Sequence, residues 1–494
     1  MKEIKNAWWD YVSILSSQVA SFPLGILYIS FVTRKLGPEN WGILTIFMSI
    51  IQLAFCLAIN WTSASIVRFG KEEFLENGHM RQTVWARSAI VFTILLIFSF
   101  LIFILKGPLA NYIGLPEQAF LLILPMLLAY SLYDFLTWIL KAMGLMKQFA
   151  LSLVLRQAAL ILLLIPLIFM AFSLNVQNVM SIEILSYFFI CVFCIFFLKL
   201  SYFFPLEKRG GKVKNILVYS WPMIFTFIFG YTTNWMDVYF IKYFLSNYHV
   251  GVYQAAYRMM SYINTPLMSV ITLLFPMLMA VKIQGRSELI QTYIKNLIPQ
   301  FSLFWNIIVS VLIVFSGPIV KIVFGNSFSG AALSFMVLLL GVGFQAVTVM
   351  YTSVFLIFDW LKYVTFIALA MSVVNFTGDM ILVPRIGILG AAISTVISYI
   401  LSSVLYLTFA NRLVSVRTHK ALFYPLLSVV SFLFCLGVSS ISLRVMFAAF
   451  NIAAFLYIAK INKLFSPADI ALFEKIEMPR LLRSGIRRVY SVLC

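Results

Sequence analysis

The sequence contains little charge. Only 11% of its 494 residues are Asp, Glu, Lys or Arg, whereas 62% are hydrophobic and the mean hydropathy is +1.00. A soluble domain carries about 25% charged residues, so this chain has too few to cover a surface in water. Apolar stretches of about 20 residues recur along it, each long enough to cross about 30 Å of hydrocarbon. The sequence therefore predicts an all-α polytopic membrane protein.

Histidine and cysteine are also scarce. The three histidines, His79, His249 and His419, lie in separate loops, and the five cysteines lie inside apolar runs or at the last residue. The Cys191-x-x-Cys194 spacing is typical of metal or redox sites. Here, however, it falls in "SYFFICVFCIFFLK" with no histidine nearby, which favours simple packing. We expect no metal site and no cofactor.

Long polar segments are missing between the apolar runs. Fourteen spans are predicted, with twelve as the alternative count. Their ranges are roughly 11–33, 43–64, 83–105, 119–140, 149–172, 181–204, 215–241, 251–281, 299–316, 330–358, 361–383, 391–411, 421–443 and 445–464. The predicted outer loops are too short for a catalytic domain, and no acid/base pair recurs at catalytic spacing. The pattern argues against an enzyme.

Lysine and arginine alternate between the two sides of these spans. Of the 36, three fall within spans (Arg87, Arg156, Arg258) and seven fall in outer segments (Arg34, Lys35, Lys106, Lys242, Lys321, Arg385, Arg444). The remaining 26 fall in inner segments, as the positive-inside rule requires when both termini are cytoplasmic. We therefore expect a multi-pass protein of the cytoplasmic (inner) membrane. The net charge of +19 reflects this topology and an attraction to anionic lipid, and because the cations are dispersed we expect no nucleic-acid partner.

One corner of the chain occurs twice. "LGPENWGIL" (36–44) aligns with "LSNYHVGVY" (245–253), which places Leu36 over Leu245 and Gly42 over Gly251. The inner loops that follow also correspond, and each joins an incoming span to an outgoing one. Two parallel repeats of this kind are a transporter arrangement with substrate at their interface. The predicted parts are a six-helix lobe (1–204), a cytoplasmic linker (205–214), a second six-helix lobe (215–411), two extra spans (412–464) and a basic amphipathic tail (465–494).

The predicted tail begins with Ser466 as a helix N-cap and Pro467 at the first helical position. Its arginines interleave with apolar residues, which is typical of a helix lying on the inner membrane face. A loosely ordered basic tail is the alternative.

Three segments carry a resemblance to a known family. "TRKLGPENWGILTIF" (33–47) resembles the Arg-x-Leu-Gly-Pro-Glu signature of Wzx-type polysaccharide flippases. "GVYQAAYRMMSYINTPL" (251–267) and "ILVPRIGILGAAISTVISYIL" (381–401) are similar to segments in the second half of those proteins. The resemblance covers about 400 residues in the expected order. It implies the fold of the MOP exporter superfamily, with two six-helix lobes around a central cavity.

The resemblance also implies a function. Wzx-type proteins flip oligosaccharides linked to undecaprenyl pyrophosphate, as in O-antigen, capsule or exopolysaccharide assembly, so the expected partners are that substrate, membrane lipid, and the polymerase and glycosyltransferases of one pathway. Alternatives are an ion-coupled multidrug exporter of the same fold and a membrane enzyme of polysaccharide assembly. The Gly-Pro-Glu corner departs from lipid II flippases, so their site residues are not carried over.

Charged residues inside spans are costly unless they face water or a partner. From their depth we expect Asp134 to pair with Arg156, and Asp237 with Arg258, whereas Arg87 is near enough to the inner end to snorkel. Structural ion pairs and helix-capping cations are the simpler interpretation.

The functional interpretation of these charges is a path for an anionic head group. Guanidinium groups offer a pyrophosphate paired hydrogen bonds that replace water. The predicted substrate-binding residues are Arg34 and Arg258 at the outer mouth and Arg68, Arg87 and Arg156 inside. The predicted coupling or ion-pair acids are Asp237, Asp134 and Asp379, the last of which could simply be hydrated near an outer end.

Overall fold

The computed structural model describes residues 2–169, 174–208, 210–414, 420–438 and 440–465, and the predicted tail helix lies outside them. Among the described residues all regular structure is helical. The α-helices are α1 (Lys2–Phe55), α2 (Trp61–Ser65), α3 (Lys71–Asn77), α4 (Arg81–Ile104), α5 (Lys106–Ile113), α6 (Glu117–Phe120), α7 (Ile123–Ala142), α8 (Met146–Phe169), α9 (Val176–Phe196), α10 (Gly210–Ser220), α11 (Met223–Phe244), α12 (Asn247–Ile283), α13 (Ser287–Thr292), α14 (Ile298–Val314), α15 (Ser316–Phe324), α16 (Ala331–Ile357), α17 (Leu361–Ile386), α18 (Ile388–Val414), α19 (Lys420–Gly437) and α20 (Ile441–Ile461). Three π-helical turns, η1 (Cys56–Asn60), η2 (Ile66–Gly70) and η4 (Tyr293–Leu297), and two 3₁₀ turns, η3 (Leu200–Tyr202) and η5 (Asn326–Phe328), complete it.

The predicted polytopic all-α fold is confirmed. Within the described residues, eleven helical stretches are long and apolar enough to cross a membrane, or twelve if α10 and α11, bent by 47°, form one span. One of the eleven, Ser13–Asn77, covers the first two predicted spans. These two spans are counted together because the helical segments on either side of the kink at Gly37 (φ 73°, ψ 171°) follow each other without a loop. The predicted span 251–281 lies in α12.

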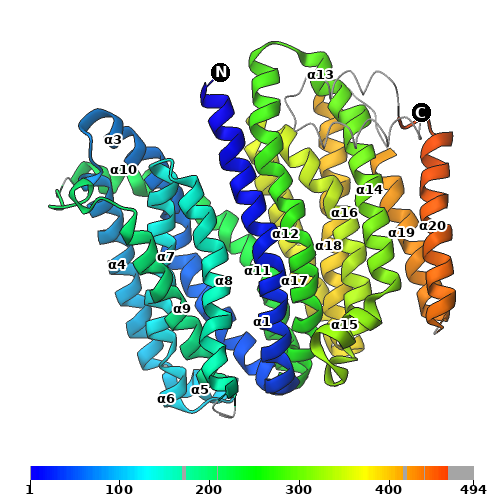
Figure 1. The fold of residues 1–494 in the computed structure, drawn as a ribbon, viewed down its shortest axis with the longest axis horizontal. Helices are drawn as coiled ribbons and strands as arrows, with labels where there is room; N and C mark the ends of the chain where they lie inside the picture. Colours follow the sequence, from blue (N-terminus) through cyan, green and yellow to red (C-terminus); the bar gives the residue numbers. More distant parts are fainter. Residues whose placement is uncertain (1, 170–173, 209, 415–419, 439, 466–494) are drawn as a thin grey trace. The chain divides into compact units, whose positions relative to one another are not determined.

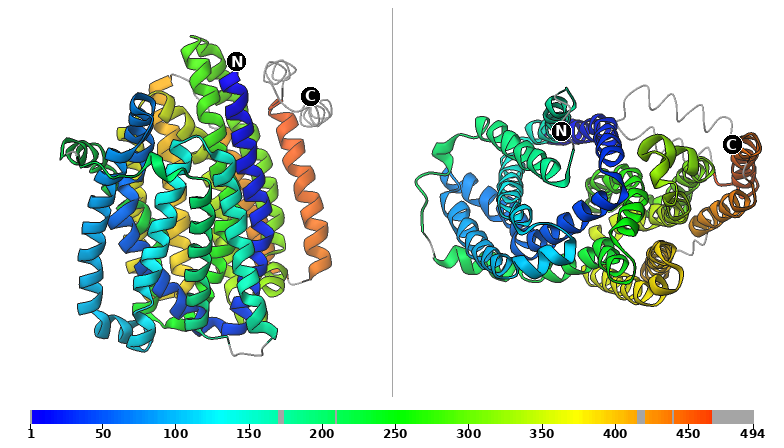
Figure 2. Two further views of the ribbon diagram at one scale, coloured as in Figure 1. Left: turned by 60° about the vertical axis from the view of Figure 1, so that its left-hand side comes forward. Right: turned by 90° about the horizontal axis from the view of Figure 1, so that it is seen from below.

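The chain forms two compact units. The first contains residues 1–255 with the short segments 321–328 and 383–388, and the second contains the rest. In the first unit, α8 packs beside both α1 and α9, and α7 packs beside α9 (Figure 1, Figure 2). The start of α1, α3 and α10 lie at one end of this unit, whereas α5 and α6 lie at the other (Figure 1).

The repeated corners meet in the first unit. A Cβ added at Gly42 would lie 1.9 Å from the carbonyl oxygen of Asn247, and one added at Gly251 would lie 1.8 Å from that of Pro38. Pro38 and Asn247 occupy the same position in the alignment, so each corner makes the same contact with the other. Only glycine permits this backbone approach. The two aligned corners therefore meet through a reciprocal contact, and the repeat of two six-helix lobes stays a prediction.

In the second unit, α14 packs against α16 and α19, and α20 packs against α14. Asn306 of α14 donates to the carbonyls of Ser302 (2.8 Å) and Gly343 (3.3 Å), and its side-chain oxygen accepts from Ser428 of α19 (3.0 Å). Because buried polar groups in an apolar setting need partners, these bonds fix α19, the first of the two extra spans, to α14 and α16.

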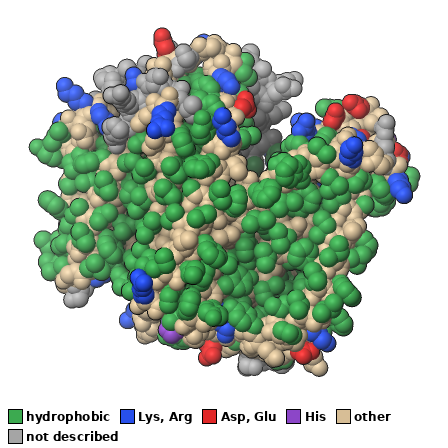
Figure 3. All heavy atoms as spheres, turned by 180° about the vertical axis from the view of Figure 1, so that it is seen from behind, with side chains coloured by type: hydrophobic (Ala, Val, Ile, Leu, Met, Phe, Trp, Pro, Cys, Tyr) green, Lys and Arg blue, Asp and Glu red, His purple; other side chains and the backbone are tan. Residues whose placement is uncertain are grey.

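The surface matches a membrane protein. In Figure 3, hydrophobic side chains cover the middle of both units, and the charged side chains gather towards the ends of the helices. This distribution suits a bilayer whose hydrocarbon meets the apolar band.

Candidate functional site

The first membrane-embedded arginine site is built on Arg156 of α8. Its Nη2 lies 2.8 Å from Oε2 of Glu183 on α9, and its guanidinium lies 4.1 Å from the centre of the Tyr187 ring. The Tyr28 hydroxyl of α1 donates to the other Glu183 oxygen at 2.9 Å. Three helices therefore hold one ion pair. A bilayer favours such a pair over either charge alone.

The Arg156 guanidinium is only partly used. Its side chain keeps 21% of its surface exposed, and among the described residues its Nε has no hydrogen-bond partner. An arginine has five N–H donors in a planar fork. The exposed part of the Arg156 side chain leaves room for a further acceptor, but the Nε is itself buried and not open to solvent.

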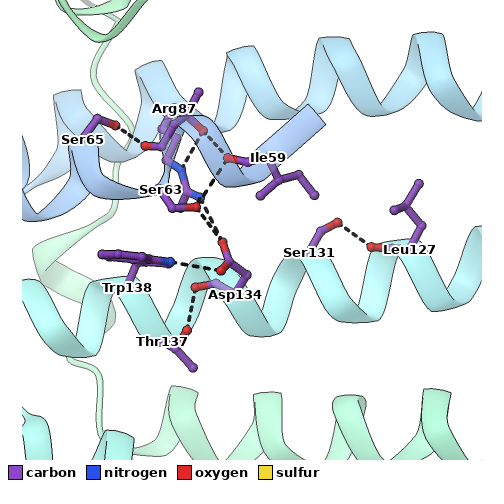
Figure 4. A network of polar contacts seen from close by, with 10 residues as sticks. Ile59, Ser63, Ser65, Arg87, Leu127, Ser131, Asp134, Thr137 and Trp138 are labelled. Atoms are coloured by element: carbon purple, nitrogen blue, oxygen red, sulfur yellow. Dashed lines mark hydrogen bonds and ion pairs between the residues drawn. The ribbon is translucent and has the colours of Figure 1, made fainter. Parts of the chain in front are cut away.

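The second embedded site surrounds Arg87 of α4 and is closed (Figure 4). The Arg87 side chain has no exposed surface, and its Nη2 lies 3.1 Å from Asp134 of α7 and 2.8 Å from the Ser63 hydroxyl. Asp134 also accepts from Ser63 (3.0 Å) and from the Trp138 indole (3.0 Å). Because the pair is enclosed and satisfied on several sides, it joins α4, α7 and the α2 segment.

These contacts correct the predicted pairing. Asp134 pairs with Arg87, and Arg156 pairs with Glu183, so the expected Asp134–Arg156 pair is wrong. Arg87 also does not snorkel, because its side chain is fully buried. Tyrosine rings lie between the two sites: Tyr187 is 5.2 Å from Tyr130, which is one helical turn from Asp134.

The sequence analysis did not predict Glu183 as a residue inside the membrane. The predicted span began at residue 181, which left this acid at the membrane boundary. In the structure α9 begins at Val176, after Asn175 caps it by accepting from the Asn178 N–H at 2.8 Å. Glu183 thus lies two turns inside the helix. The Asn175 cap was the signal that could have revealed it.

Two predicted substrate arginines lie near helix ends. Arg34 donates from Nε to the Val323 carbonyl at 3.2 Å and from Nη2 to the Ile322 carbonyl, at the end of α15. Cations at a helix C-terminus satisfy its free carbonyls. Arg68 is exposed in η2, with its guanidinium over the Tyr219 ring at 4.4 Å.

The remaining acids are buried. Asp237 of α11 is 1% exposed, accepts from the Val238 N–H at 2.8 Å and lies beside the Tyr253 hydroxyl. It belongs to the first unit and the half-buried Arg258 to the second, so their pairing stays a prediction.

Asp379 of α17 has no exposed surface and accepts from Ser394 of α18, which corrects the expectation of a hydrated carboxylate. Within the described part of the chain, no group of three His, Cys, Asp or Glu residues could hold a metal ion.

Comparison with known proteins supports one family. The profile described as "Polysaccharide biosynthesis protein" matches residues 7–282. A probable low-salt glycan biosynthesis flippase, Agl15 of Haloferax volcanii, is 27% identical over 213 residues, which are 43% of this chain and 45% of that protein. The succinoglycan biosynthesis transport protein ExoT of Rhizobium meliloti is 29% identical over 119 residues, 24% of this chain. The matched parts thus span less than half of either relative, 45% and 22% of their lengths.

Solved structures show the same fold. Lipid II flippase MurJ in an inward closed conformation matches 91% of this chain and 98% of its own, with a TM-score of 0.70 and 14% identity. An inward-facing multidrug resistance MATE transporter of the MOP superfamily matches 82% of this chain and 98% of its own, with a TM-score of 0.65 and 15% identity. At such identities the likeness concerns the fold alone. Because the family profile covers more than half of the chain, this protein belongs to the polysaccharide biosynthesis protein family, and it has the MOP transporter fold.

Proposed function

We propose that this protein is a flippase. It moves an oligosaccharide repeat unit linked to a polyprenyl pyrophosphate, of the undecaprenyl type, from the cytoplasmic to the outer leaflet. The family match and the transport roles named for the two relatives support this reaction class. The polar sugar would travel in an aqueous cavity that opens to each side in turn, while the prenyl chain remains in lipid.

Arg156 is the observation that carries the proposal. A pyrophosphate that leaves water needs donors to replace its hydration, and a guanidinium supplies them in a bidentate geometry. Arg156 keeps 21% of its side-chain surface exposed and is oriented by Glu183 and Tyr187. The Arg156–Glu183 pair is neutral as a whole, so a phosphate would have to compete with Glu183 for the hydrogen bonds of Arg156.

Arg87 and Arg34 have another role in this proposal. The closed Arg87–Asp134 pair holds helices together, and Arg34 caps α15. Arg258, half-buried on α12, is the second arginine assigned to substrate. The two-lobe organisation (1–204 and 215–411), the cytoplasmic termini and the inner-membrane location belong to the same proposal.

Transport in proteoliposomes tests it. A fluorescent lipid-linked oligosaccharide is placed in one leaflet, and its movement is followed with an impermeant quencher. The wild type should move it, Arg156→Ala should slow movement at least about tenfold, and Arg156→Lys should restore only part because a point charge loses the bidentate geometry. Arg444→Ala is the matched control, since Arg444 of α20 donates to the Val438 and Cys435 carbonyls within the extra spans.

A second measurement tests the alternative function, that of a multidrug exporter with the same fold. The same liposomes are loaded with a cationic dye. Efflux of the dye without movement of the oligosaccharide would contradict the proposal. Normal oligosaccharide movement by folded Arg156→Ala would remove Arg156 from the site.

A further inference from the structure

Two cations surround one pair of aromatic rings at the end of the first unit where α3 and α10 lie (Figure 1). The Arg68 guanidinium lies 4.4 Å from the centre of the Tyr219 ring and 5.3 Å from that of Phe69. The Lys212 Nζ lies 5.7 Å from the same Phe69 ring. Phe69 and Tyr219 meet edge to face with centres 5.5 Å apart. The cluster joins η2 to α10, segments about 140 residues apart.

The fold holds this cluster in place from both sides. Ile216 of α10 is fully buried and packs with Trp61 and Ile90. Lys212 and Tyr219 are four residues before and three after Ile216, so they lie on the same helical face. Arg68 is on a π-helical turn, a feature frequent at functional sites.

The two cations have no carboxylate partner. In the described parts of the chain neither Arg68 nor Lys212 has an ion pair within 4.0 Å; two acids of the neighbouring segments, Glu73 and Glu207, are already bound, and two on α3, Glu72 and Glu76, are exposed. Glu73 is buried and accepts from the Thr83 N–H at 2.8 Å, and Glu207 pairs with Arg81 at 3.3 Å. Stacking on aromatic faces stabilises each cation, but it leaves the positive charge free to bind an anion.

Apolar side chains are exposed on the other side of α10. Leu217 and Val218 are 38% and 62% exposed, and Trp221 just beyond the helix is 54% exposed. Their spacing places them away from the face that carries Lys212 and Tyr219. A phosphate carried by a lipid could bind the cations while its chain lies on the apolar side of the same helix, whereas a soluble phosphate would use the cations alone.

We propose that Arg68 and Lys212, braced by Phe69 and Tyr219, form an entry site for the phosphate groups of a lipid-linked substrate at the end of the first unit. This site rests on the proposed flippase function and precedes Arg156 on the substrate's path. The Lys/Arg distribution predicts that this end faces the cytoplasm, where such a substrate is made. Arg68 supplies the planar bidentate donor and Lys212 a mobile point charge.

Binding to the full-length protein in nanodiscs tests the site. The discs are phosphatidylcholine doped with a polyprenyl diphosphate, and parallel discs contain phosphatidylglycerol instead. We expect Arg68→Gln and Lys212→Gln each to weaken diphosphate binding about tenfold, the usual effect of losing a charged hydrogen bond, with unchanged melting temperature. Lys321→Gln, which removes an exposed cation of α15 in the same unit, is the matched control.

Each result supports or contradicts one part of the proposal. Unchanged diphosphate affinity in both folded variants would overturn the site. An equal loss of phosphatidylglycerol binding would show a general anionic-lipid surface and overturn the substrate assignment. If inorganic pyrophosphate binds as tightly as the lipid, the role of the apolar surface is wrong. If the wild type flips no oligosaccharide but binds the diphosphate through Arg68, the flippase proposal fails and the site stands. If the wild type flips it and Arg68→Gln binds normally, the site fails and the flippase stands.

Discussion

Two arginines embedded in the first unit differ in what surrounds them. The Arg87 side chain has no exposed surface and meets an acid and a hydroxyl, whereas the Arg156 side chain keeps 21% of its surface exposed. A buried pair stabilises a fold less than its geometry suggests, but loss of one partner leaves an uncompensated charge. At the residue scale, Arg87 is therefore expected to act on folding and Arg156 on substrate.

The Arg87–Asp134 pair can be tested by removing one side or both. Arg87→Ala should destabilise the protein by about 3–5 kcal/mol, because Asp134 would remain buried without its cation. The double variant Arg87→Met/Asp134→Leu should recover most of the loss. Thermal unfolding in detergent, followed by size-exclusion chromatography, measures both. A folded Arg87→Ala protein that binds substrate but cannot move it would instead place Arg87 on the transport path.

Arg34 gives a second residue-scale prediction. Arg34→Gln should cost about 1 kcal/mol of stability, because the terminal carbonyls of α15 lose a cationic donor. Transport by the folded variant should match the wild type. Lys35→Gln, next to it and also exposed, is the control and should change neither quantity. Loss of transport in folded Arg34→Gln would support its predicted role in substrate binding.

The sequence singled out charged residues inside the predicted spans but did not show which of them meet. Depth along a span is a single coordinate, so it placed Asp134 level with Arg156. The partner of Asp134 depends also on which helices are neighbours and which faces they turn, and these follow from packing across the whole unit. Glu183 was missed for a local reason, since an error of five residues at the start of α9 moved it from the membrane to its edge.

At the element scale, the two corners are held by glycine. Gly42→Ala and Gly251→Ala should each destabilise by more than the about 1–3 kcal/mol of ordinary overpacking. The reason is that each added Cβ would meet a backbone carbonyl at under 2 Å, and a backbone cannot rotate away as a side chain can. Gly230→Ala in α11 is the control: nothing lies within 4 Å of its Cβ position, and alanine favours a helix. Melting temperatures in detergent measure all three.

If the melting temperature of either corner variant equalled that of Gly230→Ala, the two corners could move apart without a loss of stability. These corners were the element that sequence predicted best. The alignment of Gly42 with Gly251 used only spacing, and the structure gives the reason for it, since a two-fold contact between repeats demands glycine at both positions.

At the scale of the whole molecule, the topology prediction rests on Lys/Arg placement. Reporter fusions after Lys214 and after Lys420 should both report the cytoplasm, and a fusion after Ile113 should report the exterior. Within the first unit this agrees with the structure, which puts the start of α1 and α10 at one end and α5 at the other (Figure 1). An exterior signal after Lys214 would contradict both the topology and the proposed entry site.

Energy coupling is the last property of the whole molecule. Repeated outward movement requires the cavity to reset, and a ligand favours one state only through its differential affinity. Asp134 is neutralised by Arg87, so it is a poorer carrier of an ion than Asp237, which is buried beside a tyrosine hydroxyl. We expect a proton or sodium gradient to accelerate transport in proteoliposomes, and Asp237→Asn to remove that acceleration while leaving slow movement. Asp359→Asn, in an exposed turn with φ 58° that asparagine tolerates, is the control. Transport by the wild type that ignores both gradients would mean that consumption of the flipped product drives the flux, and Asp237 would then have a structural role only.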